Sequence, residues 1–164
     1  LLKAMSQVIK KFPQIELILV GDGPDKQFFF DLIKKLGIVS NVKFTGNVTK
    51  NKILQFYSNS TIVVVPSIYP DNFPTVCIEA MSVGRPLIGT RMGGIQELID
   101  DGETGYLVSP KNEYTIADTI IKLLSNKSLL NRFSSNSIKK STKYSLEEHI
   151  KKIEKLYKKY GKEI

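Results

Sequence analysis

Residues that form disulfides and metal centres are almost missing from this sequence. It contains one cysteine, Cys77, and one histidine, His149, among 164 residues. A single cysteine excludes an internal disulfide, and no Cys/His cluster has the spacing of zinc ligands. Because such chains are typical of reducing compartments, we expect a cytoplasmic protein. We interpret Cys77 as a small buried filler and His149 as a surface residue.

Long apolar segments are missing as well. The longest apolar run, residues 62–66, is far too short to cross a bilayer, and the first residues show no signal-peptide pattern. These two absences predict a protein without a membrane span. The chain is 41% hydrophobic and has no low-complexity stretch, so its length suits the core of one domain. We therefore expect residues 1–164 to form a single domain.

Acidic residues are outnumbered, and the basic excess is concentrated at one end. The net charge is +8, and residues 137–164 contain nine lysines but only four glutamates. Such an end suits either a solvated helix face or an anionic membrane surface, which would place the protein peripherally at the inner face of the membrane. The aromatic pattern that stacks on nucleic-acid bases is missing, so we expect no nucleic-acid partner.

Apolar residues recur in alternating helical and strand patterns. Short apolar runs predict five strands, at residues 16–20, 42–45, 61–65, 86–90 and 106–108. Helical patterns lie before, between and after these strands, including a short helix over residues 129–133. This alternation with short connections predicts an α/β fold, with a Rossmann-like parallel sheet and helices on both faces. Ligands of such sheets bind at the carboxyl ends of the strands.

The end of the chain carries its own helix signal. Ser145 and Glu148 form a Ser-x-x-Glu capping box, which predicts a helix over residues 145–160. Apolar residues recur along one side of this helix. We expect the helix either to pack back on its own domain or to pack toward another domain of the same protein.

Four loops follow predicted strands and are therefore expected at one edge of the sheet. They are residues 21–23, 46–48, 66–75 and 91–94. Gly21 and Gly23 either bring the backbone close to a phosphate or sugar, or simply form a tight turn. The dinucleotide fingerprint requires a third glycine where this chain has Lys26, so a Rossmann dehydrogenase is disfavoured. The Gly93-Gly94 pair has the same two interpretations.

Two carboxylates, Asp71 and Glu79, lie at the ends of the segment that leads into the helix after the third strand. The start of a helix suits a phosphorylated ligand, because free N–H groups and the positive end of the helix dipole point outward there. Glu79 lies at the border of the apolar strip, where it either binds hydroxyls such as a ribose diol or serves only the helix dipole or a salt bridge. Asp71 alone also fits a simple turn.

Residues 66–108 combine these features in one dense motif. An acidic residue is followed after seven residues by Glu-Ala-Met, then by Gly-x-Pro, Gly-Gly-x-x-Glu and Asp-Gly-x-Thr-Gly-x-Leu-Val. This motif resembles the signature of the family 4 retaining glycosyltransferases, and the Val-Gly-Asp-Gly-Pro and Phe-Thr-Gly-Asn-Val loops extend the resemblance over nearly the entire chain. Members of the family have the GT-B architecture of two facing Rossmann-like halves. The resemblance implies that this chain is the C-terminal, nucleotide-sugar-binding half.

The resemblance also implies a substrate and a reaction. A family member of hexosyl type transfers a sugar from a nucleotide-diphosphate sugar to an acceptor, a glycan or a lipid-linked molecule, with retention at the anomeric carbon. The resemblance implies no metal and no other cofactor, and the sequence has no Asp-x-Asp metal motif. The alternative is a non-catalytic module that only binds a nucleotide or a nucleotide sugar.

Matching positions imply roles for individual residues. Asp71 would be the catalytic residue, holding a hydroxyl of the donor sugar, and Glu79 would bind the ribose hydroxyls. The remaining donor-binding residues would line the cleft, flank the base and offer N–H groups to the diphosphate. In that order they are Gly21 and Gly23, Asn47 and Val48, and Asn72, Phe73, Pro74, Thr75 and Val76.

Two departures from the family pattern modify these expectations. Asp71 stands where the family usually has Glu, which withdraws the carboxylate by about 1.5 Å. The family's first strand, with an arginine and a lysine that neutralise the leaving diphosphate, is not found before Leu1. We therefore expect the isolated chain to be inactive, and its parent, with an N-terminal acceptor-binding domain, to be an active enzyme.

Overall fold

The computed structural model describes residues 1–161, which form alternating helices and strands. In chain order the elements are α1 (Leu2–Lys11), β1 (Leu17–Val20), α2 (Lys26–Leu36), η1 (Val39–Asn41), β2 (Val42–Gly46), α3 (Lys50–Asn59), β3 (Val63–Val65), α4 (Thr75–Ser82), β4 (Leu87–Thr90), α5 (Ile95–Leu98), β5 (Gly105–Val108), α6 (Glu113–Leu124), α7 (Lys127–Ser141), η2 (Thr142–Tyr144) and α8 (Leu146–Tyr160). Each of the five predicted strands is present, with bounds within two residues of those expected.

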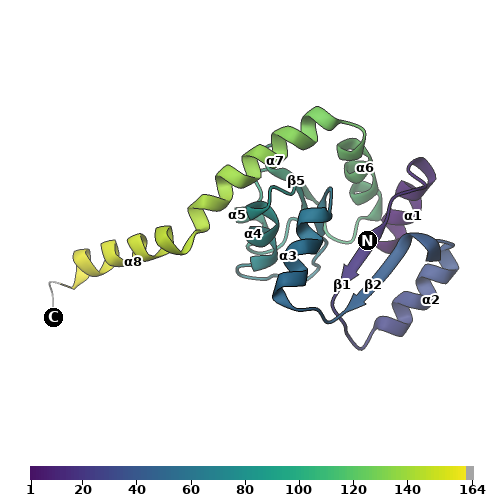
Figure 1. Cartoon of the computed structure of the whole chain (residues 1–164), viewed down its shortest axis with the longest axis horizontal. Coiled ribbons are helices and arrows are strands. Elements are labelled where there is room, and N and C mark those ends of the chain that lie inside the picture. The colour runs from purple at the N-terminus through teal and green to yellow at the C-terminus, as the bar shows by residue number, and fades with distance from the viewer. Residues whose placement is uncertain (162–164) are drawn as a thin grey trace.

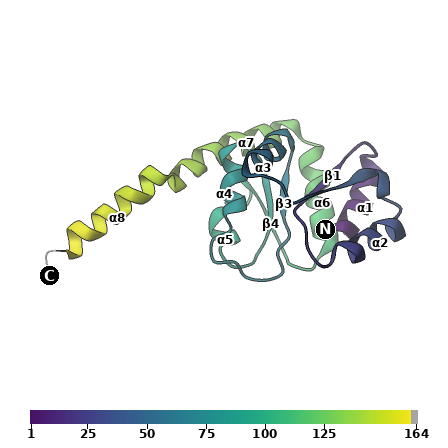
Figure 2. The same ribbon diagram turned by 60° about the horizontal axis from the view of Figure 1, so that its bottom comes forward.

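All strands pair in parallel, but they form two hydrogen-bonded pieces of sheet. β1 pairs with β2 in one piece, and β3, β4 and β5 follow in this order in the other. Within residues 1–161 no strand joins β1 to β3, so each of these two strands has one edge without a backbone partner. Both pieces still share a core, because Leu19 of β1 and Val64 of β3 contact the same hydrophobic cluster. Figures 1 and 2 show the two pieces within one body.

Helices cover both faces of the three-stranded piece. Ile88 of β4 belongs to a cluster shared with α1 and α6, whereas the adjacent Leu87 belongs to a second cluster shared with α4 and α5. Since β4 is the central strand, all four of its residues are buried. The predicted α/β fold, a parallel sheet between layers of helices, is confirmed.

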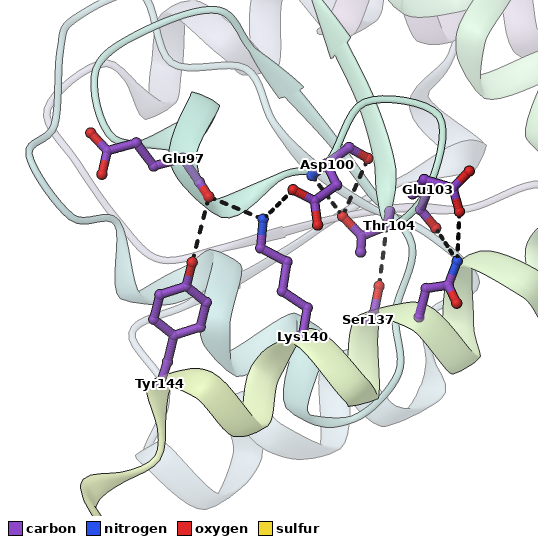
Figure 3. Close-up of polar contacts among 8 residues, drawn as sticks. Glu97, Asp100, Glu103, Thr104, Ser137, Lys140 and Tyr144 are labelled. Carbon is purple, nitrogen blue, oxygen red and sulfur yellow. Dashed lines mark hydrogen bonds and ion pairs between the residues drawn. The ribbon is translucent and has the colours of Figure 1, made fainter. Parts of the chain in front are cut away.

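α7 is much longer than the short helix expected over residues 129–133. It runs for 15 residues, although its second half consists mainly of Ser, Asn and Lys. These polar side chains bind the loop between α5 and β5: Asn136 Nδ2 donates to the Glu103 carbonyl at 3.0 Å. Ser137 Oγ likewise donates to the Thr104 carbonyl at 3.2 Å (Figure 3). The expected length was wrong because contacts with a distant loop stabilise this helix, and apolar spacing does not reveal them.

α8 begins at the predicted capping box and extends away from the rest of the structure (Figures 1 and 2). Ser145 Oγ accepts a hydrogen bond from the Glu148 N–H at 3.2 Å, which confirms the cap. No residue of α8 is buried, and even its apolar Leu146 and Leu156 are 72% and 56% exposed. In the part of the chain described, no helix has the length and hydropathy needed to cross a membrane.

Candidate functional site

The segment between β3 and α4, residues 66–74, lies at the carboxyl end of the three-stranded sheet, and we call it the β3–α4 loop. Residues 66–72 line an open hollow on the surface. Thr90, at the end of β4, is buried and donates its hydroxyl to the Ser67 carbonyl at 2.6 Å. The loop is therefore attached to the neighbouring strand at its start, and its later residues border solvent.

Asp71 is fixed through both its side chain and its backbone. One carboxylate oxygen accepts the Phe73 N–H at 3.0 Å, which forms an Asx turn, and the Asp71 carbonyl accepts the Gly94 N–H at 2.7 Å. The other carboxylate oxygen has no hydrogen-bond partner within residues 1–161, and the residue is exposed. Asp71 can therefore be a turn residue and also bind a ligand, because one carboxylate oxygen holds the turn and the other is accessible.

Gly93 and Gly94 lie directly against this turn. A Cβ atom on Gly94 would stand 2.1 Å from the Asn72 carbonyl oxygen, and one on Gly93 would stand 2.4 Å from the Asp71 carbonyl oxygen. Gly94 has an ordinary helical φ of −67°. The close approach of the two loops, and not the backbone conformation, therefore requires glycine at position 94. The Gly94 N–H is already bonded to Asp71, so this group serves the turn.

The first turn of α4 carries two free backbone donors. Pro74 has no N–H, and the Phe73 N–H is bonded to Asp71. The N–H groups of Thr75 and Val76 have no acceptor in the described part of the chain, and both residues are exposed. Two free donors at the positive end of a helix dipole suit an anion such as a phosphate group.

Glu79 lies one turn further along α4, half-buried, with its carboxylate beside Tyr57 of α3. Burial, and then the nearby charge of Glu79, raises the pKa of Tyr57 to about 12. Within residues 1–161 Glu79 forms no ion pair, and the group beside its carboxylate is a neutral phenol and not a basic side chain. The Glu79 carboxylate therefore keeps acceptor sites for ligand hydroxyls. Sequence analysis missed this role of Tyr57, because a contact between α3 and α4 has no local sequence signal.

The loops after β1 and β2 are joined to each other. The Gly21 N–H donates to the Gly46 carbonyl at 3.1 Å, and the φ of +119° at Gly21 favours glycine. No other described group lies within 4 Å of a Cβ placed on Gly21 or Gly23, so both glycines border open space. Next to Gly46, Asn47 is exposed and Val48 is half-buried. Hydrogen bonds thus connect the predicted loops in two pairs, one at Gly21 and one at Asp71.

Cys77 has the buried environment of a structural residue. Its side chain is fully buried, and burial, then the charge of Asp71, raises the pKa of the thiol to about 12. A protonated, inaccessible thiol is a poor nucleophile, so the interpretation as a buried filler is confirmed. Among the described residues, no three His, Cys, Asp or Glu side chains are grouped so that they could hold a metal ion.

Sequence comparison assigns this chain to a family. Residues 1–140 match the family described as "Glycosyl transferases group 1". The chain therefore belongs to this glycosyltransferase family, and the resemblance inferred from its motifs is confirmed. A glycosyltransferase of Methanocaldococcus jannaschii is 31% identical over 160 residues, which cover 96% of this chain and 40% of that protein. The N-acetyl-alpha-D-glucosaminyl L-malate synthase of Bacillus anthracis is 35% identical over 133 residues, which cover 77% and 34%.

Solved structures agree in fold. Sucrose-phosphate synthase from Thermosynechococcus elongatus superposes with a TM-score of 0.85 and 25% identity, covering 99% of this chain and 43% of that chain. Anabaena HepE in complex with UDP and glucose gives a TM-score of 0.78 and 27% identity, covering 86% and 39%. These neighbours are GT-B glycosyltransferases, and the chain has the fold of the C-terminal half of that architecture. It spans only 34–43% of the length of the four proteins named here.

Proposed function

We propose that this chain is the donor-binding half of a retaining, hexosyl-type glycosyltransferase that uses a nucleotide-diphosphate sugar. One observation carries the proposal: the free N–H groups of Thr75 and Val76 lie between Asp71 and Glu79 on a single continuous segment. A diphosphate supplies the negative charge that such donors bind, and the flanking carboxylates suit sugar and ribose hydroxyls. The complex of the related HepE with UDP and glucose supports this choice of ligand.

The proposal assigns a role to each group of predicted residues. The accessible oxygen of Asp71 accepts a hydrogen bond from the donor sugar and borders the reaction centre. Glu79, which lies beside Tyr57, accepts hydrogen bonds from the ribose diol. Asn47 and Val48 flank the base. The open space beside Gly21 and Gly23 supports a position for them along the wall of the same cleft.

Transfer also requires stabilisation of the charge that develops on the leaving diphosphate. Two backbone donors supply part of it, and we propose that basic side chains of a segment upstream of Leu1 supply the rest without a metal. The free edges of β1 and β3 support this idea, because a parallel strand could pair with both. The isolated chain is then expected to bind the donor but not to transfer its sugar.

The apolar side of α8 supports an N-terminal acceptor-binding domain in the same parent protein. Ile150 and Ile153, in the middle of that side, are 46% and 38% exposed, and no part of α8 is buried. Packing against a second domain would cover this side and leave the lysines in solvent. We therefore propose that α8 is a contact between the two halves of the parent. We also propose that the parent acts in the cytoplasm.

An anionic membrane at the inner face of the cell is the other surface that an amphipathic, lysine-rich helix suits. Sedimentation of the full-length parent with phosphatidylserine vesicles separates the two possibilities. We expect no binding when α8 is covered by the N-terminal domain. Salt-sensitive binding to these vesicles, and none to phosphatidylcholine vesicles, would instead support a peripheral membrane location.

Calorimetric titration with UDP, GDP and ADP tests donor binding directly. We expect the wild-type chain to bind one of these nucleotides, and Glu79→Ala to weaken binding by about 1.5–3 kcal/mol, the value of a charge-assisted hydrogen bond. Glu154→Ala, which removes an exposed carboxylate from α8, is the matched control and should bind like the wild type. Unchanged affinity in Glu79→Ala would show that Glu79 is structural.

A non-catalytic nucleotide-binding module would have the same site. The full-length parent distinguishes the two functions. Sugar transfer by the parent, and none by this chain, supports the enzyme. Nucleotide binding by the parent without transfer to any glycan or lipid-linked acceptor would favour the module.

A further inference from the structure

An aromatic contact holds the β3–α4 loop from outside the proposed nucleotide site. The ring of Phe73 packs against the ring of Tyr144, with centroids 5.9 Å apart and the ring planes 60° apart. Tyr144 belongs to η2, the short helix that directly precedes α8. Phe73 remains 49% exposed with this contact in place, so the Tyr144 ring covers part of a residue that otherwise borders solvent.

Tyr144 is anchored to elements other than the loop. Its hydroxyl lies 3.5 Å from the Glu97 carbonyl, and Lys140 Nζ donates to the same carbonyl at 3.0 Å (Figure 3). Lys140 is buried and also pairs with Asp100 at 2.7 Å. The Tyr144 ring packs against the core cluster of α4 and α5. The aromatic ring that Phe73 meets is therefore part of a fixed surface.

The position of Phe73 is coupled to the residues that bind the donor. Its N–H donates to the Asp71 carboxylate, and it directly precedes Pro74, the N-cap of α4. On the other side of the turn, the Gly94 N–H holds the Asp71 carbonyl. The turn is thus held from two directions, by a backbone hydrogen bond at Gly94 and by an aromatic contact at Tyr144.

We propose that Tyr144 is a positioning residue, whose ring holds Phe73 and thereby fixes the Asp71 carboxylate and the start of α4 for nucleoside-diphosphate binding. This inference rests on the proposed function, in which those groups bind the donor. It assigns the ring, and not the hydroxyl, as the essential part of Tyr144. It also connects the donor site to the base of α8, the helix for which we propose a contact with the second domain.

Three variants test the proposal in calorimetric titrations with UDP, GDP and ADP. Tyr144→Ala removes the ring and should weaken nucleotide binding about two- to ten-fold, the range for one aromatic pair. Tyr144→Phe keeps the ring and should bind like the wild type. Tyr114→Ala removes a tyrosine that is 66% exposed on α6, and it should also leave binding unchanged. Circular dichroism of each variant checks that the chain is folded.

A double-mutant cycle separates positioning from a general loss of stability. If Tyr144 acts through Phe73, then Tyr144→Ala should have no further effect in a Phe73→Ala background. Full affinity in folded Tyr144→Ala would overturn the proposal. A loss of the same size in both backgrounds would overturn it as well.

A wild-type chain that binds none of the three nucleotides would refute the proposed function. Amide NMR spectra would still test whether Tyr144 positions the start of α4. Displaced Thr75 and Val76 signals in Tyr144→Ala, restored in Tyr144→Phe, would support Tyr144 as the anchor of this segment. Unchanged signals in Tyr144→Ala would overturn that role.

Discussion

Substitution of Gly94 by alanine is expected to displace the β3–α4 loop and weaken nucleotide binding about ten-fold. The new Cβ would start 2.1 Å from the Asn72 carbonyl oxygen, so the two loops must separate by roughly 1 Å. That separation lengthens the 2.7 Å hydrogen bond from the Gly94 N–H to Asp71 beyond useful range. Loss of one such bond, about 1 kcal/mol, and displacement of the Thr75 donor give the expected change. Calorimetric titration with UDP, GDP and ADP measures it.

Gly102→Ala is the matched control for this experiment. Gly102 has a φ of +82°, and no neighbouring group lies within 4 Å of its Cβ position. Alanine there strains the backbone by about 1–2 kcal/mol without pushing the loops apart. Both variants should therefore unfold at lower urea concentration than the wild type, but only Gly94→Ala should lose affinity. A folded Gly94→Ala protein with wild-type affinity would show that the close approach of the two loops does not position the donor-binding groups.

Three further substitutions have defined consequences. The pKa of Tyr57 is about 12 in the folded chain and ordinarily 10. The contribution of its protonated phenol to the free energy of unfolding is therefore complete below pH 10 and is lost as the pH rises toward 12. Tyr57→Phe should then lose less unfolding free energy than the wild type over that interval in urea titrations. Lys140→Met should cost about 1–3 kcal/mol in urea unfolding, because the partly buried hydrogen bonds to the Glu97 carbonyl and Asp100 are lost. Exposed Lys139→Met should cost little, and equal losses would contradict the role of Lys140. Asn126→Ala removes the cap of α7, in which its side chain accepts the Leu129 N–H at 2.9 Å, and should cost about 1 kcal/mol by thermal unfolding, unlike exposed Asn131→Ala.

Local sequence signals predicted most of the elements. Residues 61–65 consist entirely of β-branched residues, and residues 86–90 form a short, mainly apolar run after a glycine turn, which is why both were recognised as strands. The left-handed Gly37 ends α2 with a φ of +69°, and Ser145 caps α8. The motif around Asp71 and Glu79 was recognisable because the residues that shape it are adjacent in the chain.

Features that depend on distant contacts could not be predicted in this way. The polar second half of α7 is helical because Ser137 and its neighbours bind the loop before β5. The side chains that hold the two site residues, Tyr57 beside Glu79 and Tyr144 against Phe73, come from other elements of the chain. The division of the sheet into two pieces is likewise a property of strand pairing, for which apolar runs give no signal.

Titration of the ¹⁵N-labelled chain with nucleotides, followed by amide NMR, tests whether the start of α4 binds the diphosphate of the donor. UDP, GDP and ADP are added in turn. Since Thr75 and Val76 have free N–H groups, we expect large, saturable shifts of both signals with one of these nucleotides. The Phe73 signal should move less, because its N–H is already bonded to Asp71. Saturable shifts confined to other parts of the chain would contradict a donor site at the start of α4.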